Sequence, residues 1–435
     1  MKQYRGATGK IYNIEPDPIA KGGEGTIHAI ENEEDIVAKV YKKEKRTQRR
    51  YEKLSLMVQY HLTDLQRRQV TWPLDVIYED NQFAGYIMPR LYSTEDFTMV
   101  CSADISSITL EDRLFIAYNV CAAVDTVHAF GQVCGDLNPQ NICVNMDSAN
   151  SETGFMVTLV DTDSYHIVNG RMMYRCEVGQ ANYLPPELQA RLSSGESLAT
   201  MALPTYSKET DRFALAIHLF SLFMNGCHPF ACALDMAETK DLDISIEIPQ
   251  PTDNIREGYS PFFHKRPGVT YPAYAPDFTS LPESFQKLFT RTFIDGHKDP
   301  SARASAREWM EEIMLILQNK SYIKCPKGHV YFIHKMECPY CAMNMRNQYI
   351  RDKISPPKPV RPEISTPVPA APSYSEPQST SGSQSSFEAQ STGWGQTPRE
   401  EKISLLEFME SHVVFILYGA ILILFIALIV WYFTS

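Results

Sequence analysis

The sequence lacks the dense cysteine framework of a secreted, disulfide-rich protein. Its ten cysteines are spread over 435 residues, and only Cys338 and Cys341 form a tight pair. This spacing indicates reduced thiols in a cytosolic setting. The first ten residues are polar and contain no apolar core of a signal peptide. We therefore expect the N-terminal part of the chain to stay in the cytoplasm.

An excess of basic charge is missing as well. The formal net charge is -11 at pH 7, and the basic run at 42–50 is interpreted as the solvated face of one helix. We expect no nucleic acid partner, because binding a phosphate backbone depends on basic side chains that displace counterions. Hydrophobic residues make up 44% and charged residues 21% of the chain. This ordinary composition allows a large folded core.

Local composition divides the chain into four zones. Residues 12–319 alternate apolar segments with turn signals and are predicted to form one large mixed domain. Residues 322–345 concentrate three cysteines and two histidines. Residues 346–411 are rich in Pro, Ser and Thr, so we predict a disordered linker that buries too little apolar surface to fold.

The fourth zone, residues 413–433, is an unbroken apolar run. About 20 helical residues cross the roughly 30 Å hydrocarbon layer of a bilayer. Trp431 and Tyr432 stand where an aromatic belt is expected. We predict a single C-terminal transmembrane helix, a tail anchor with the upstream domain on the cytoplasmic side. The alternative is a buried core helix.

A glycine cluster and a lysine predict a phosphate-binding half. Gly22, Gly23 and Gly25 lie in one predicted loop, where the missing Cβ atoms let backbone N–H groups approach phosphates. Lys39 follows in a β-like stretch between small apolar residues. A lysine turned inward there needs phosphate oxygens and a carboxylate partner. The alternative is an edge-strand lysine that faces solvent.

The carboxylate partner of Lys39 is expected on the helix predicted at 49–59. Glu52 is the candidate, and Glu44 is its rival. A later strand at 83–88 ends before a proline. A chain break there suits a hinge between two lobes, which would put Met88 next to the nucleotide.

The most specific segment runs from 128 to 142. Asp136 can orient or deprotonate an attacking hydroxyl, and the amide oxygen of Asn141 can help to hold a metal ion. An apolar strand at 157–160 then runs into Asp161, a carboxylate well placed for magnesium. Taken singly, each of these residues also suits a turn, a cap or a helix start.

In this order and spacing, the residues resemble the eukaryotic-type (Hanks-type) protein kinase superfamily, in a divergent bacterial-like branch, over roughly residues 14–315. Residues 179–187 resemble the end of a kinase activation segment. Residues 211–220 resemble the buried central helix of the large lobe of a kinase. Residues 299–303 resemble the closing motif, whose arginine, here Arg303, pairs with Glu187. The resemblance implies an α+β, bilobal protein-kinase-like fold.

The resemblance also implies roles at matching positions. The glycine loop would cover the phosphates, and Asp211 would steady the catalytic loop. Lys39 would bind α/β-phosphate oxygens, Asp136 would be the catalytic base, and Asn141 and Asp161 would hold magnesium.

Several positions depart from the family pattern. Cys134-Gly135 replace the usual His-Arg, so the switch by a phosphorylated activation segment is expected to be absent. Asn138 takes the place of a catalytic lysine, which should slow transfer by about 10²-fold if that lysine contributes roughly 2.7 kcal/mol. Asp163 replaces the glycine of Asp-Phe-Gly, and Ala20 the first loop glycine.

A second motif predicts a metal site after the kinase-like region. Four side chains in two Cys-Pro turns form a Cys₃His set of the kind that structural zinc prefers: Cys325, His329, Cys338 and Cys341. His334 could replace His329. The alternative is a chance cluster of reduced thiols.

Together these features predict a membrane-anchored Ser/Thr protein kinase that uses ATP and Mg²⁺, acts on protein substrates and phosphorylates its own linker. One alternative is an ATP-binding or inactive pseudokinase scaffold that presents the zinc module to partners. The other is a small-molecule kinase on the same fold.

Overall fold

The computed structural model describes residues 1–147, 155–235 and 247–354, and residues Met1–Asp352 form one compact unit. The predicted transmembrane run at 413–433 and nearly all of the predicted linker lie outside the described residues. Within the described part, no helix has the length and apolar character needed to cross a bilayer.

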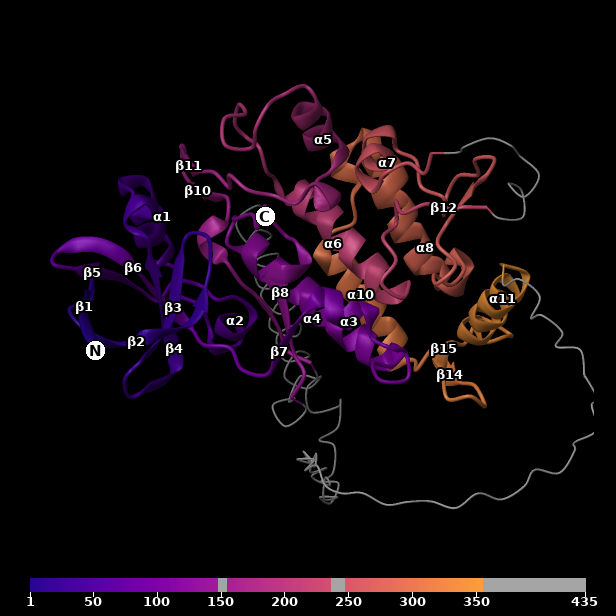
Figure 1. The fold of residues 1–435 in the computed structure, drawn as a ribbon, viewed down its shortest axis with the longest axis horizontal. Coiled ribbons are helices and arrows are strands. Elements are labelled where there is room, and N and C mark those ends of the chain that lie inside the picture. The colour runs from indigo at the N-terminus through magenta and orange to yellow at the C-terminus, as the bar shows by residue number, and fades with distance from the viewer. Residues whose placement is uncertain (148–154, 236–246, 355–435) are drawn as a thin grey trace, which may run out of the picture. The chain divides into compact units, whose positions relative to one another are not determined.

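The N-terminal lobe is a closed, antiparallel six-stranded barrel in the order β1-β2-β3-β4-β6-β5, drawn in indigo and violet in Figure 1. Its strands are β1 (Lys2–Gly6), β2 (Ile11–Lys21), β3 (Gly25–Ile30), β4 (Glu33–Tyr41), β5 (Asp75–Glu79) and β6 (Gln82–Pro89). Strand β1 closes the barrel by pairing with both β2 and β5. The predicted domain start at residue 12 therefore falls inside β2.

Alternation along β4 gives the lobe two apolar surfaces. Ala38 packs inside the barrel with residues of the other strands, whereas Val37 and Tyr41 belong to the main core on the outer face. Because strand side chains alternate, Lys39 shares that outer face. Helix α1 (Gln48–Met57), capped by Thr47, buries Leu54 and Met57, and the short helix α2 (Asp64–Gln69) follows it.

The second lobe is mainly helical. Helix α4 (Leu110–Ala129) begins at a capping box made by Thr109 and Asp112. Helix α6 (Lys208–Phe223) is buried along nearly its whole length and packs against α4. The other helices of this lobe are α3 (Phe97–Ser102), α5 (Pro186–Ser193), α7 (Pro251–Glu257), α8 (Glu283–Thr290), α9 (Gly296–Lys298) and α10 (Ala306–Gln318).

Short strands carry the loops between the lobes. A three-stranded sheet consists of β7 (Thr94–Asp96), β8 (Ile142–Asn145), which begins directly after Asn141, and β9 (Val157–Leu159), which ends shortly before Asp161. The hairpin of β10 (Ile167–Asn169) and β11 (Met172–Tyr174) follows. Farther along the chain, β12 (Ala233–Leu234) pairs antiparallel with β13 (Val269–Thr270). The α+β kinase-like fold expected from the sequence is confirmed for the described residues.

The last described segment, residues 322–354, is called the knuckle below. It consists of the hairpin β14 (Tyr322–Lys324) and β15 (Val330–Phe332), followed by helix α11 (Pro339–Ile354). The knuckle belongs to the same compact unit as the two lobes.

Candidate active site

A cleft of about 730 Å³ brings together most of the predicted site. Its walls come from the glycine loop, helix α1, the catalytic loop, the end of β9 and the segment after β11. The predicted residues that line it are Gly22, Gly23, Gly25, Lys39, Asp136 and Asp161. Residues more than one hundred positions apart in the chain therefore share one site.

Lys39 is held in the cleft by two carboxylates. Its Nζ donates to Oδ1 of Asp161 and to Oδ1 of Asp163, at 2.7 Å in each case, and its side chain is only 12% exposed. Burial alone would lower the pKa of Lys39, but Asp163 and Asp161 hold it above its usual range. The lysine therefore stays charged, as phosphate binding requires.

Asp163 is the buried anchor of this pair. Its side chain is 1% exposed, and its carboxylate also accepts hydrogen bonds from the hydroxyls of Tyr41 (2.5 Å) and Tyr86 (2.8 Å). Burial by itself would raise the pKa of Asp163, but the Lys39 ammonium and these hydrogen bonds hold it well below its usual range. Sequence reasoning noted Asp163 only as a departure from the family and missed this role.

The expected pair between Lys39 and Glu52 is not among the contacts of the described residues. Glu52 accepts a hydrogen bond from Gln48 instead (3.0 Å), and Glu44 lies exposed in a short turn before α1. The residue of α1 that reaches the site is Lys53, whose Nζ donates to the Asp163 carbonyl at 2.6 Å. Burial lowers the pKa of Lys53 to about 8.

The helical phase of α1 explains this difference. One residue turns an α-helix by about 100°, so Glu52 and Lys53 point in clearly different directions. Lys53 lies four residues before the buried Met57 and shares its face. The four-residue spacing of Lys53 and Met57 could have identified Lys53 as the inward-facing residue from the sequence, but an acidic partner was expected on this helix.

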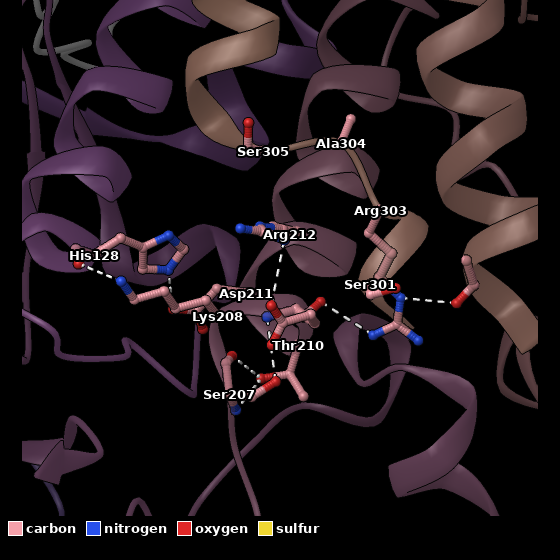
Figure 2. A network of polar contacts seen from close by, with 12 residues as sticks. His128, Ser207, Lys208, Thr210, Asp211, Arg212, Ser301, Arg303, Ala304 and Ser305 are labelled. Carbon is pink, nitrogen blue, oxygen red and sulfur yellow. Dashed lines mark hydrogen bonds and ion pairs between the residues drawn. The ribbon is translucent and has the colours of Figure 1, made fainter. Parts of the chain in front are cut away.

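The loop that carries Asp136 is fixed by Asp211, which Figure 2 draws next to His128. Its carboxylate accepts hydrogen bonds from the backbone N–H of Cys134 (2.8 Å) and Gly135 (2.9 Å) and contacts His128 Nε2 (2.9 Å). These contacts give Asp211 the role that the resemblance implied.

Burial raises the pKa of Asp136, and hydrogen bonds from Asn138 and the Gln180 backbone partly offset this effect.

Two asparagines shape the end of the catalytic loop. Oδ1 of Asn138 accepts the backbone N–H groups of Gln140 (2.9 Å) and Asn141 (3.2 Å), so Asn138 caps the turn that contains Asn141. Nδ2 of Asn141 donates to the Asp136 carbonyl at 2.9 Å. Since the amide nitrogen is used in this bond, the amide oxygen is the atom that can bind a metal ion.

Asp161 and Asn141 come from adjacent strand ends. The Val160 N–H, next to Asp161, donates to the Asn141 carbonyl at 2.9 Å. Asp161 adopts the left-handed conformation (φ 56°, ψ 37°), which non-glycine residues adopt rarely and often at functional sites. Burial and the negative charge of Asp163 raise the pKa of Asp161, whereas the Lys39 ammonium lowers it by a smaller amount. The two side chains offer the hard oxygen donors that Mg²⁺ prefers.

The glycines of the loop serve different purposes. A Cβ on Gly25 would lie 2.3 Å from the Val40 carbonyl oxygen, so close packing of β3 on β4 requires this glycine. A Cβ on Gly22 or Gly23 would meet little or nothing. These two remain the candidates for a close approach to phosphate.

Met88 lies opposite Val37 in the β4–β6 ladder. Its side chain is packed in the main core, and the residues that line the cleft do not include it. Its predicted contact with a nucleotide stays a prediction.

The predicted metal ligands Cys325, His329, Cys338 and Cys341 form a second cluster, in the knuckle. Nε2 of His334 instead contacts the Thr279 carbonyl at 3.1 Å. The choice left open between the two histidines therefore falls on His329.

Comparisons with known proteins agree with this geometry. The model of the protein kinase domain matches residues 17–314, more than half of the chain. "Protein kinase YegI" of Escherichia coli K12 is 26% identical over 354 residues, which cover 78% of this chain and 50% of that protein. Its counterpart in Escherichia coli O157:H7 is 26% identical over 342 residues (75% and 48%). The chain spans about half the length of these curated relatives.

Proposed function

Because the chain belongs to the protein kinase family, we propose that it is an active, magnesium-dependent enzyme that transfers the γ-phosphoryl group of ATP to serine and threonine hydroxyls of proteins. The observation that carries this proposal is the meeting of Lys39, Asp136, Asp161 and Asp163 at one cleft.

Each residue has a chemical task in this proposal. Lys39 binds phosphate oxygens of ATP, and Asp163 keeps it charged and oriented. Asp136 accepts the proton of the attacking hydroxyl, and its raised pKa brings it closer to the working pH of a general base. Asp161 and the amide oxygen of Asn141 would hold Mg²⁺, which supplies positive charge that stabilises the transferring phosphoryl group.

The way Lys39 is anchored bears on regulation. Asp163 stands two residues after Asp161 on a buried turn, so the lysine–carboxylate pair forms within the metal-binding segment and not between β4 and a helix. Helix α1 is tied to the same segment through Lys53. We infer that the site needs no inward movement of α1 to become competent.

Asn138 favours the second candidate, a scaffold that binds ATP without transferring phosphate. The side chain caps the turn with its amide oxygen and supplies no cation to the transferring group. The remaining site is intact, which supports slow transfer over none.

The finer parts of the proposal depend on the sequence. Serine and threonine specificity follows the bacterial kinase branch that the sequence resembles. Attachment to a membrane, with the kinase domain in the cytoplasm, is proposed from the apolar run at 413–433. Phosphorylation of the chain's own linker is proposed from the Ser and Thr residues within 346–411.

The test is incubation of the full chain with Mg²⁺ and γ-labelled ATP, for wild type, Asp136→Ala and Lys39→Ala. We expect label on serine or threonine of wild type and a loss of label in both variants. ATP-dependent thermal stabilisation without label would favour the scaffold. Label that appears only on added small metabolites would favour a small-molecule kinase.

A further inference from the structure

Three thiols and one imidazole converge in the knuckle, far along the chain from the catalytic residues. Nδ1 of His329 lies 3.6 Å from Sγ of Cys325, 3.6 Å from Sγ of Cys338 and 3.4 Å from Sγ of Cys341. Sγ of Cys325 lies 3.9 Å from Sγ of Cys341. All four cysteine and histidine donors lie within 4.8 Å of one another.

These distances match the edges of a zinc tetrahedron. Zn–S bonds of about 2.3 Å and Zn–N bonds of about 2.05 Å at tetrahedral angles give S···S edges of about 3.8 Å and S···N edges of about 3.6 Å. A disulfide would instead need an S–S separation of about 2.05 Å, and the ten cysteines are free. The donor set and the spacing both fit one closed, four-coordinate ion.

The backbone prepares both ligand pairs. Between Cys325 and His329 the chain turns through Gly328 at φ +90°, and the Cys325 N–H donates to the His329 carbonyl at 2.9 Å. Cys338 and Cys341 stand at the start of α11, where the Ala342 N–H donates to the Cys338 carbonyl. Each half of the knuckle thus presents two donors on a short, hydrogen-bonded turn.

The two halves contact different parts of the helical lobe. On the hairpin side, the Tyr322 hydroxyl donates to Glu111 of α4 at 2.8 Å. On the helix side, Arg346 of α11 donates to the carbonyls of Ala273 (3.0 Å) and Ala275 (2.7 Å). Between them, Tyr331, Cys338 and Tyr340 pack on Ile105, in the turn between α3 and α4.

We propose that this Cys₃His cluster binds one structural Zn²⁺, and that the ion fastens the hairpin to α11 so that the knuckle clamps α4 to the segment at 273–275. The local core of the knuckle is too small to hold the two halves together alone, which is the usual reason for a structural metal. The knuckle is then an integral part of the kinase domain. The inference is independent of catalysis.

The first test measures metal content and thermal stability of the full chain after purification without added metal. We expect about one zinc per chain in wild type. Cys338→Ser should lose most of it and lower the melting temperature by about 5 °C, because the ion no longer holds the hairpin to α11. The matched control is Cys232→Ser, a half-buried cysteine outside the cluster. It should keep the zinc.

Two further measurements keep the test decisive if Cys338→Ser fails to fold. Removal of zinc from folded wild type with a chelator should lower the melting temperature, and added Zn²⁺ should restore it. Arg346→Ala should keep the zinc but also lower the melting temperature, because it removes the contact of α11 with the lobe. A metal-free wild type, a disulfide among the three thiols, or a chelated protein of unchanged melting temperature would each overturn the proposal.

Discussion

Asp163 gives the sharpest test of how this site differs from the family pattern. Asp163→Asn removes the buried charge that holds Lys39, while the amide oxygen can still accept hydrogen bonds from Tyr41 or Tyr86. A hydrogen bond between charged groups is worth about 1.5–3 kcal/mol. At about 1.4 kcal/mol per tenfold change, kcat/KM for ATP should fall by about 10- to 150-fold.

The same change also breaks a buried ion pair. Removing one partner of such a pair typically costs about 3–5 kcal/mol of stability, because a charge is left without its partner. Asp161 still contacts Lys39 at 2.7 Å and should keep this cost near the lower end. Thermal unfolding in parallel with the kinetics separates loss of fold from loss of transfer.

Glu52→Gln is the matched control, because the family pattern would assign the partner role to a glutamate of this helix. Its carboxylate contacts only Gln48 among the described hydrogen bonds. We expect steady-state kinetics within about twofold of wild type, since an exposed contact of this kind contributes less than about 0.5 kcal/mol. Loss of transfer in Glu52→Gln with near-normal Asp163→Asn would refute the assignment of Asp163.

Three other predictions concern the supports of the site. Asn138→Lys should not raise the rate of phosphoryl transfer above that of wild type, because it removes the cap of the turn that carries Asn141 at a cost of about 1 kcal/mol. Asn138→Asp, which keeps an oxygen acceptor at this position, should transfer faster than Asn138→Lys in the same assay. Glu187→Gln should destabilise the fold by about 1–3 kcal/mol in denaturant titrations, because it takes the carboxylate charge away from the buried guanidinium of Arg303 (2.7 Å); an unchanged midpoint would contradict this. Burial lowers the pKa of His218 from 6.5 to about 4, so the unfolded chain takes up this proton first, and this histidine alone should lower stability by about 3 kcal/mol from pH 6.5 to 4. His218→Gln should reduce the fall by about this amount, while His166 and His228, whose pKa burial also lowers to about 4, keep the remainder; a fall as steep as that of wild type would argue against the lowered pKa of His218.

Much of the fold was predictable because local signals agreed with the tertiary structure. The capping box at Thr109 and Asp112 marks the start of α4. The pairing of Arg303 with Glu187, which the resemblance to the kinase superfamily implied, is present in the structure. Strand β1 gave no comparable signal. Its role in closing the barrel depends on pairing with β5, about seventy residues away.

In the site, sequence reasoning brought together Lys39, Asp136 and Asp161, which line one cleft, but assigned the wrong partner to Lys39. The partner depends on the rotation of α1 by one residue and on the turn after β9, which buries Asp163 beside Tyr41 and Tyr86. The spacing of Lys53 and Met57 indicates the rotation of α1, but the burial of Asp163 in the turn does not follow from spacing along the chain. The Cys₃His cluster proposed to bind zinc was easier to predict, because such a set is defined by residue type and short spacing alone.

The most direct measurement is a crystal structure of the chain with a non-hydrolysable ATP analogue and Mn²⁺ in place of Mg²⁺, with the metal located by its anomalous signal. We predict a metal about 2.1–2.2 Å from oxygens of Asp161 and Asn141, with Lys39 on the phosphates and Asp163 still bonded to Lys39. A nucleotide bound away from these side chains, or a cleft without nucleotide and metal at saturating concentrations, would contradict the proposed function.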